Sequence, residues 1–104
     1  MTTFNDREAA FENKYAHDSH LQFRVEARRN KLVGLWAAGL MGKSGADADA
    51  YAMTVVQADF EEAGIEDVVR KLAGDLGEQS SDAAIRAKMS ELLLTAKTQI
   101  SSEL

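Results

Sequence analysis

The sequence predicts an all-α protein, and three observations lead to this fold class. None of the 104 residues is a proline, so nothing removes a backbone donor from a helix interior. Apolar residues recur at the three- and four-residue spacings of amphipathic helices. Glycines follow several of these stretches, where a left-handed residue would end a helix. Because the connections are short, neighbouring helices should be antiparallel, and we expect an up-down four-helix bundle.

The first predicted helix is long, and its apolar residues fall on two different faces. Its N-terminal half carries three aromatic residues on one face: Phe4, Phe11 and Tyr15. The stripe of the C-terminal half, centred roughly 80° away, suits a bundle core and consists of Leu21, Val25, Leu32, Leu35 and Trp36. One straight helix cannot direct both faces at the same core. We therefore expect either a break near residues 16–20 or a mobile or projecting N-terminal half that serves another surface.

Three further helices are expected over residues 44–63, 65–76 and 82–100. Ser44 has the spacing of a capping box for the first of them. The run 80–82 offers a hydroxyl cap and an acidic first turn for the last. Each range also has apolar residues at i, i+3, i+4 and i+7, so each is expected to place one face in the core.

The absence of cysteine and a net charge of −5 limit the classes of function. Without cysteine, disulfides and thiolate metal sites are excluded. Residues 1–43 carry seven basic and five acidic side chains, whereas residues 44–104 carry five basic and twelve acidic ones. Because nucleic-acid binding requires a net basic face, we expect no nucleic-acid partner. The apolar runs are too short to cross a bilayer, so we expect no membrane insertion and a cytoplasmic location.

The sequence offers no catalytic arrangement, so we expect neither catalytic residues nor an enzyme. It has no cysteine nucleophile and no serine–histidine–acid set in a supporting context. His17 and His20 lie three residues apart with Asp18 between them, but no third ligand follows at a metal-binding spacing. A solvated polar turn is the simpler interpretation, and we expect no metal. A further hypothesis is that protonation of the two histidines adds positive charge to this segment at low pH.

The aromatic face of the opening segment is typical of a helix that binds in a groove of another protein. We therefore divide the chain into residues 1–19, a partner-binding segment, and residues 20–104, a helical bundle. The candidate contact residues are Phe4, Arg7, Phe11, Lys14 and Tyr15. The alternative is that the segment folds back and packs on the body of the same chain.

A basic stripe follows the spacing i, i+4, i+7 on the first helix and consists of Arg24, Arg28 and Lys31. Such a stripe is a candidate site for a nucleotide phosphate or an acidic partner. It can equally pair with acidic side chains of this chain, several of which lie within residues 59–66. Both interpretations stay open at this stage.

Several stretches resemble one known family over nearly the whole chain. The most specific is FRVEARRNKLVGLWAA at residues 23–38, and the others are TTFNDRE at 2–8, SGADA at 44–48, DFEEAG at 59–64, EDVVRK at 66–71 and IRAKM at 85–89. They are similar to the zeta subunit of alphaproteobacterial ATP synthases. Residues 13–20, in contrast, are richer in histidine and less acidic than the family pattern.

The resemblance implies a four-helix protein that inhibits ATP hydrolysis by the rotary enzyme. Its N-terminal segment would enter a catalytic interface between an alpha and a beta subunit and obstruct rotation in one direction. On this chain that role would fall on residues 1–19, including Phe4, Arg7, Phe11 and Tyr15. The implied partners are the alpha, beta and gamma subunits, at the periphery of the inner membrane. The alternatives are a regulatory module that binds ATP or ADP, with no other cofactor, and an assembly factor of the same complex.

Overall fold

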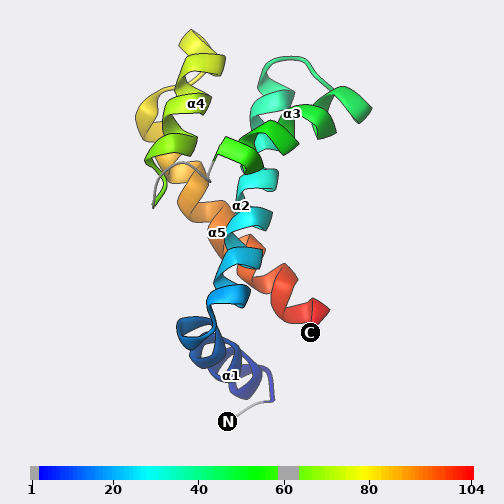
Figure 1. Cartoon of the computed structure of the whole chain (residues 1–104), viewed down its shortest axis with the longest axis vertical. Helices are drawn as coiled ribbons and strands as arrows, with labels where there is room; N and C mark the ends of the chain where they lie inside the picture. The colour runs from blue at the N-terminus through cyan, green and yellow to red at the C-terminus, as the bar shows by residue number, and fades with distance from the viewer. Residues whose placement is uncertain (1–2, 59–63) are drawn as a thin grey trace.

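The computed structural model describes the backbone of residues 3–58 and 64–104, and the side chains of residues 10–58 and 64–104. The predicted all-α class is confirmed, and no strand occurs in the described part of the chain. The described elements, in chain order, are α1 (Thr3–His17), α2 (Ser19–Leu40), α3 (Gly45–Ala58), α4 (Glu66–Leu76), the short 3₁₀ helix η1 (Gly77–Gln79) and α5 (Asp82–Glu103) (Figure 1).

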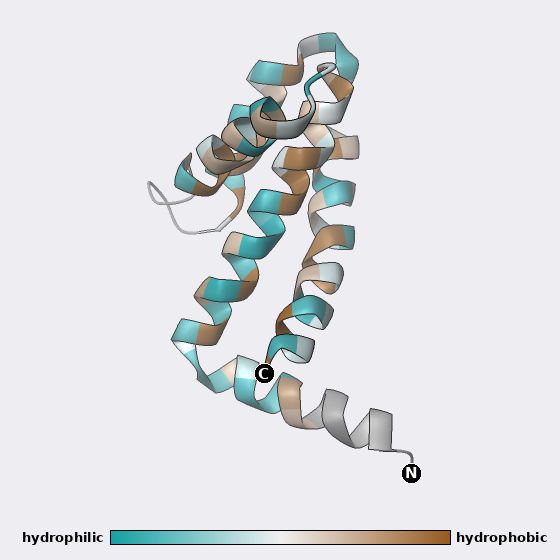
Figure 2. Ribbon diagram, turned by 90° about the vertical axis from the view of Figure 1, so that its right-hand side faces the viewer, coloured by the Kyte–Doolittle hydropathy of each residue, from teal (hydrophilic) through white to brown (hydrophobic). Residues whose placement is uncertain are grey.

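The two longest helices, α2 and α5, form an antiparallel pair that runs through the length of the molecule (Figure 2). Helix α1 lies across the end of this pair where α2 begins and α5 finishes. Helix α3 crosses α2 at the opposite end, and α4 covers the start of α5 there (Figure 1). This arrangement does not confirm the expected up-down four-helix bundle.

Of the two alternatives for the long first helix, the structure shows the break, because the chain forms two helices separated by Asp18. The break falls within the interval of residues 16–20 that the two apolar faces predicted. The last helix begins as expected, with the Ser81 side chain accepting a hydrogen bond from the Ala84 amide at 3.1 Å. The C-terminal end of the predicted helix 44–63 lies outside the described residues, since α3 is described to Ala58.

Helix α2 contributes to two separate apolar clusters, one at each end of the molecule. The larger, with α3, α4 and α5, contains Val33, Ala37, Val55, Val68, Val69, Leu72, Leu76, Ile85 and Met89. The smaller, with α1 and α5, contains Phe11, Leu21, Val25, Ala96 and Ile100. Each half of α2 therefore has its own core, and the smaller one includes an aromatic residue of the opening segment.

Helices α2 and α3 approach so closely that only glycine fits at the crossing point. A Cβ atom at Gly34 would lie 2.7 Å from the Ala52 Cα and 3.2 Å from the Val55 Cγ2. Contact with backbone cannot be relieved by a rotamer change, so the two helices would have to separate.

In the described part of the chain, no helix is long and apolar enough to cross a membrane.

We predict that Gly34→Ala destabilises the protein although alanine favours helix. The helix gains about 1 kcal/mol in propensity, but overpacking at the crossing costs typically 1–3 kcal/mol. Gly74→Ala is the matched control, since Gly74 lies inside α4 and no atom lies within 4 Å of a Cβ there. Urea unfolding monitored by circular dichroism should show Gly74→Ala to be the more stable by roughly 1–3 kcal/mol. Equal stability of the two variants would contradict the close approach.

Candidate partner-binding site

The turn between α1 and α2 is a single residue whose two sides are capped by side chains. Asp18 is extended (φ −114°, ψ 103°), and its carboxylate Oδ1 accepts a hydrogen bond from the Leu21 amide at 3.1 Å. On the other side, Gln22 Nε2 donates to the Tyr15 carbonyl at 3.0 Å. Helix ends leave backbone groups without intrahelical partners. The two side chains satisfy one such group on each side and thereby stabilise the break.

Phe11 is buried by helices of its own chain. Its side chain is 7% exposed and belongs to the smaller cluster, between α2 and α5. The ring of Tyr15 is stacked on that of Phe11, with centroids 6.2 Å apart and planes 22° apart. Tyr15 is only half-buried, so the outer part of the aromatic face reaches solvent.

Lys97 of α5 holds the outer part of the aromatic face by its charge. Its Nζ lies 4.7 Å from the centroid of the Tyr15 ring and 3.7 Å from the Glu12 Oε2. Burial and the nearby Glu26 carboxylate raise the pKa of the Tyr15 hydroxyl above its ordinary value. The ring therefore stays neutral over the physiological range, and its face can attract the ammonium group.

A groove of about 460 Å³ separates α1 from the last turn of α5. Its lining combines one end of the aromatic face with small polar residues and an exposed terminal side chain: Ala10, Phe11, Lys14, Ser101, Ser102 and Leu104. Helix α1 is thus seated on α5 through a limited area and leaves open space beside it.

The candidate contact residues of the opening segment do not all lie on one exposed surface. Phe11 and Tyr15 face the chain's own α2 and α5, whereas Lys14 is exposed at the groove. The side chains of Phe4 and Arg7 lie outside the described residues. The role of all five in binding a partner stays a prediction, as does the division into residues 1–19 and 20–104.

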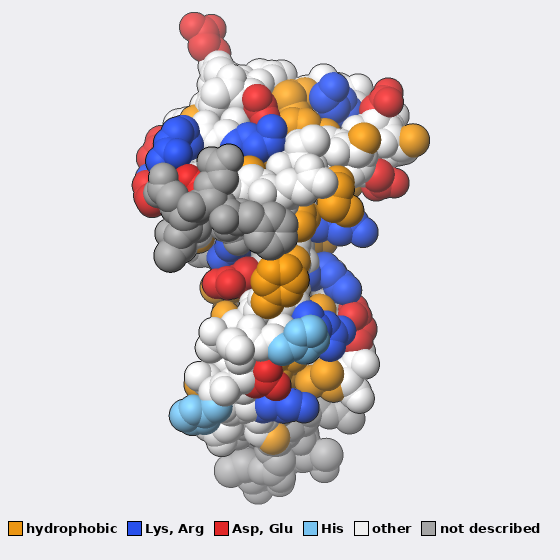
Figure 3. Space-filling model, in the orientation of Figure 1, with side chains coloured by type: hydrophobic (Ala, Val, Ile, Leu, Met, Phe, Trp, Pro, Cys, Tyr) orange, Lys and Arg blue, Asp and Glu red, His pale blue; other side chains and the backbone are white. Residues whose placement is uncertain are grey.

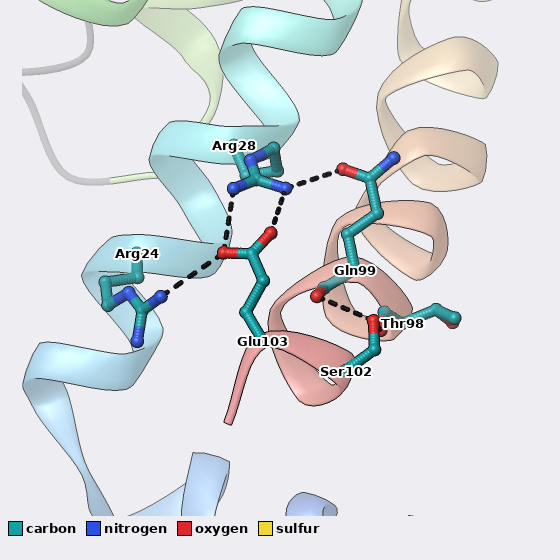
Figure 4. Close-up of polar contacts among 6 residues, drawn as sticks. All are labelled: Arg24, Arg28, Thr98, Gln99, Ser102 and Glu103. Atoms are coloured by element: carbon teal, nitrogen blue, oxygen red, sulfur yellow. Dashed lines mark hydrogen bonds and ion pairs between the residues drawn. The ribbon is translucent and has the colours of Figure 1, made fainter.

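Two residues of the basic stripe are paired within the chain (Figure 4). Arg28 donates to Glu103 Oε1 at 3.0 Å and lies 2.7 Å from Oε2, and Arg24 approaches the same carboxylate at 3.4 Å. Arg28 also donates to Gln99 Oε1 at 2.9 Å. Lys31 is exposed on the same helix. The Glu103 carboxylate therefore lies where the phosphate of a nucleotide would have to bind, and nucleotide binding at this stripe stays a prediction.

The two histidines lie on the surface beside the junction of α1 and α2, coloured pale blue in Figure 3. Within the described residues, no three histidine, cysteine, aspartate or glutamate side chains form a group that could hold a metal ion. The hydrogen bond that the Asp18 carboxylate accepts from the Leu21 amide explains the polar residue between them as a helix cap.

Sequence reasoning missed three residues that organise this end of the molecule: Gln22, Lys97 and Glu103. Gln22 contacts a residue 7 positions away in the sequence. Lys97 contacts residues 82 and 85 positions away, and Glu103 contacts residues 75 and 79 positions away. Gln22 could have been found, because it lies one turn beyond a predicted helix break and an amide can cap the preceding helix. The other two resemble many solvated charges on amphipathic helices, and no local pattern distinguishes them.

We predict that Asp18→Ala lowers the free energy of unfolding by about 1 kcal/mol, the usual cost of losing an N-cap. Asp18→Asn is the matched variant, since its amide oxygen can still accept the hydrogen bond from the Leu21 amide. Urea unfolding of the three proteins measures the difference. A stability of Asp18→Ala equal to that of Asp18→Asn would show that the cap contributes nothing.

We also predict that acid removes the contribution of the Glu103 ion pairs to stability. The hydrogen bond from Arg28, with the charges of Arg28 and Arg24, holds the pKa of the Glu103 carboxyl below its ordinary value. A pKa lowered by folding favours the folded state above the unfolded-state pKa, and this contribution is lost as pH falls through the lowered value. Glu103→Gln should therefore be less stable than the wild type at pH 7, and the difference should decrease as the pH falls below the ordinary pKa of glutamate and through the lowered value. A difference that is independent of pH would contradict this assignment.

Comparison with known proteins gives the family. Among curated proteins no sequence matches this chain. A solved structure described as "Solution NMR structure of the protein" is 57% identical, covers 81% of this chain and 99% of its own, and superimposes with a TM-score of 0.76. The family model described as ATPase inhibitor subunit zeta matches residues 1–99. The chain therefore belongs to the family of ATPase inhibitor subunit zeta.

Proposed function

We propose that this chain inhibits ATP hydrolysis by an ATP synthase and that α1 is the inhibitory element. In this proposal α1 enters a catalytic interface between an alpha and a beta subunit, near the gamma subunit, and obstructs rotation. The protein acts as a regulatory subunit and not as an enzyme. It would work in the cytoplasm, at the periphery of the inner membrane, through its attachment to the synthase.

The observation that carries the proposal is the separation of α1 from the rest of the fold at Asp18. The aromatic face of residues 1–19 belongs to a distinct 15-residue helix, which joins the body through one capped residue. Such a helix can reorient as a unit, and an amphipathic helix is a common ligand for a groove on another protein. The family description agrees with an inhibitory role.

Aromatic side chains would supply most of the affinity. A well-buried aromatic anchor at an interface contributes about 2 kcal/mol or more, and Phe11 and Tyr15 are the described candidates. Exposed charges such as Lys14 would affect the association rate more than the affinity. A helix of this length is marginal on its own, so binding in a groove would stabilise it.

The body would remain outside the interface as a bulky stop. Helices α2 to α5 keep the larger apolar cluster when α1 moves, because that cluster contains no residue of α1. The body can therefore stay folded while α1 is bound elsewhere. Nucleotide binding is less well supported, since Arg24 and Arg28 already bind Glu103 and an incoming phosphate would have to displace it.

We predict that removal of residues 1–17 abolishes inhibition of the isolated catalytic head while helices α2 to α5 persist. This truncation keeps Asp18 as the cap of α2. The measurement is the rate of ATP hydrolysis by the head as a function of added protein, with circular dichroism as the check on folding. A truncated protein that inhibits as well as the intact chain would refute the role of α1.

A pair of charge reversals refines this test without shortening the chain. Lys14→Glu changes the exposed edge of α1, whereas Lys43→Glu changes another exposed lysine, after α2 and at the other end of the molecule. Association with the head should be slower for Lys14→Glu and unchanged for Lys43→Glu, with a difference that decreases at high salt. An equal effect of both variants would indicate a general charge effect, not contact through α1.

A further inference from the structure

The described residues of the aromatic face of α1, Phe11 and Tyr15, already pack against other helices of the same chain. We propose that the packing of α1 on α2 and α5 is an autoinhibitory contact, which must open before α1 can bind the catalytic head. This inference rests on the proposed function, because it concerns the regulation of the same helix. The contact consists of a buried aromatic ring, a bridging lysine, an ordered dock on α5 and a one-residue hinge.

Phe11 is buried in the closed state, in which α1 packs on α2 and α5, and would also be buried in the complex with the catalytic head. Its side chain is 7% exposed and shares the smaller cluster with Leu21, Val25, Ala96 and Ile100. The ring cannot fill this cluster and a groove of another subunit at the same time. The apparent affinity for the partner is therefore reduced in proportion to the fraction of molecules in which α1 is free.

Lys97 supplies the polar part of the closed state. One ammonium group contacts two side chains that are three residues apart on α1, the Glu12 carboxylate at 3.7 Å and the Tyr15 ring at 4.7 Å. Residues at this spacing share a helix face, so the lysine holds α1 in one orientation. Both contacts are lost when α1 leaves α5.

The dock for α1 on α5 consists of Ala96, Lys97 and Ile100, and ion pairs hold the turn that follows against α2 (Figure 4). Glu103 is bound by Arg28 and Arg24, and the Ser102 hydroxyl donates to the Thr98 carbonyl at 3.1 Å. Residues of the same turn line the groove beside α1: Ser101, Ser102 and Leu104. These contacts join the end of α5 to α2 and to its own preceding turn.

The hinge is Asp18, the single residue between the two helices. Rotation about its backbone angles can move α1 as a rigid body, as hinge motions do in other proteins. The cap on α2 does not involve α5 and can persist during this motion. Opening then breaks the contacts of Phe11 and Lys97 but leaves the helices α2 and α5 paired.

Cross-linking tests whether the closed state is inactive. The chain contains no native cysteine, so the double variant Ala10→Cys with Ser102→Cys places thiols only on the two walls of the groove. Joined by a short bismaleimide, the protein should inhibit the catalytic head at least about tenfold less than the same variant without the linker. Undiminished inhibition by the cross-linked protein would overturn the proposal.

Weakening the closed state tests whether it limits inhibition. Lys97→Ala should make α1 amides exchange faster with solvent and should strengthen inhibition about fivefold, since one cation–π contact and one ion pair are removed. Lys88→Ala is the matched control, because Lys88 also lies on α5 and stacks on a ring, that of Trp36, without contacting α1. Unchanged or weaker inhibition by Lys97→Ala would overturn the proposal.

The truncation of residues 1–17 separates failure of this inference from failure of the proposed function. If truncation abolishes inhibition but the cross-link does not, α1 inhibits without having to open and only the autoinhibitory contact is wrong. If truncation leaves inhibition intact, both the inhibitory role of α1 and the proposed autoinhibitory contact are wrong. Hydrogen exchange of α1 in Lys97→Ala reports the closed contact in the absence of any partner.

Discussion

At Asp18 the chain leaves the helical conformation for one residue, and two side chains satisfy backbone groups that this break exposes. The Asp18 carboxylate accepts from the first turn of α2, and Gln22 donates to the last turn of α1. Without the break, a continuous helix would carry its aromatic face roughly 80° away from the stripe that packs on α5. With it, α1 turns across the end of the α2–α5 pair and Phe11 reaches the smaller cluster. The position of the aromatic face therefore depends on this local capping.

The two clusters on α2 make the stability of the fold uneven. The larger cluster joins three other helices, and the close approach at Gly34 keeps α3 against α2. The smaller cluster contains five buried residues, and the described side chains that hold α1 there are Phe11, the half-buried Tyr15 and the partners of Lys97. Segments with few buried apolar contacts open at the lowest free energy. From the described contacts, we expect the helix to which we assign inhibition to open at lower free energy than the helices of the larger cluster.

Inhibition by such a helix requires an exchange of contacts. Free in solution, α1 buries Phe11 in its own chain, which protects an aromatic face from nonspecific association. On the catalytic head the same ring would be buried in another groove, and the loss of the internal contact lowers the net affinity. In the proposed mechanism the stability of the closed state sets how strongly the subunit inhibits, and Lys97 of α5 is where that stability can change without altering α1 itself.

The sequence by itself determined the helical class and most helix starts, and it gave a break near residues 16–20 as one of two alternatives. These features depend on interactions within a few residues: helical periodicity, the missing proline, and a cap such as that of Ser81. The crossing of α3 over α2, the burial of Phe11 and the pairing of Arg24 and Arg28 with Glu103 were decided only by the tertiary structure. Each depends on which helices meet, and contacts between residues as distant as Arg24 and Glu103 leave no local pattern in the chain. A face of aromatic residues looks the same in sequence whether it packs on its own chain or on another protein, because removing apolar surface from water is favourable in both cases.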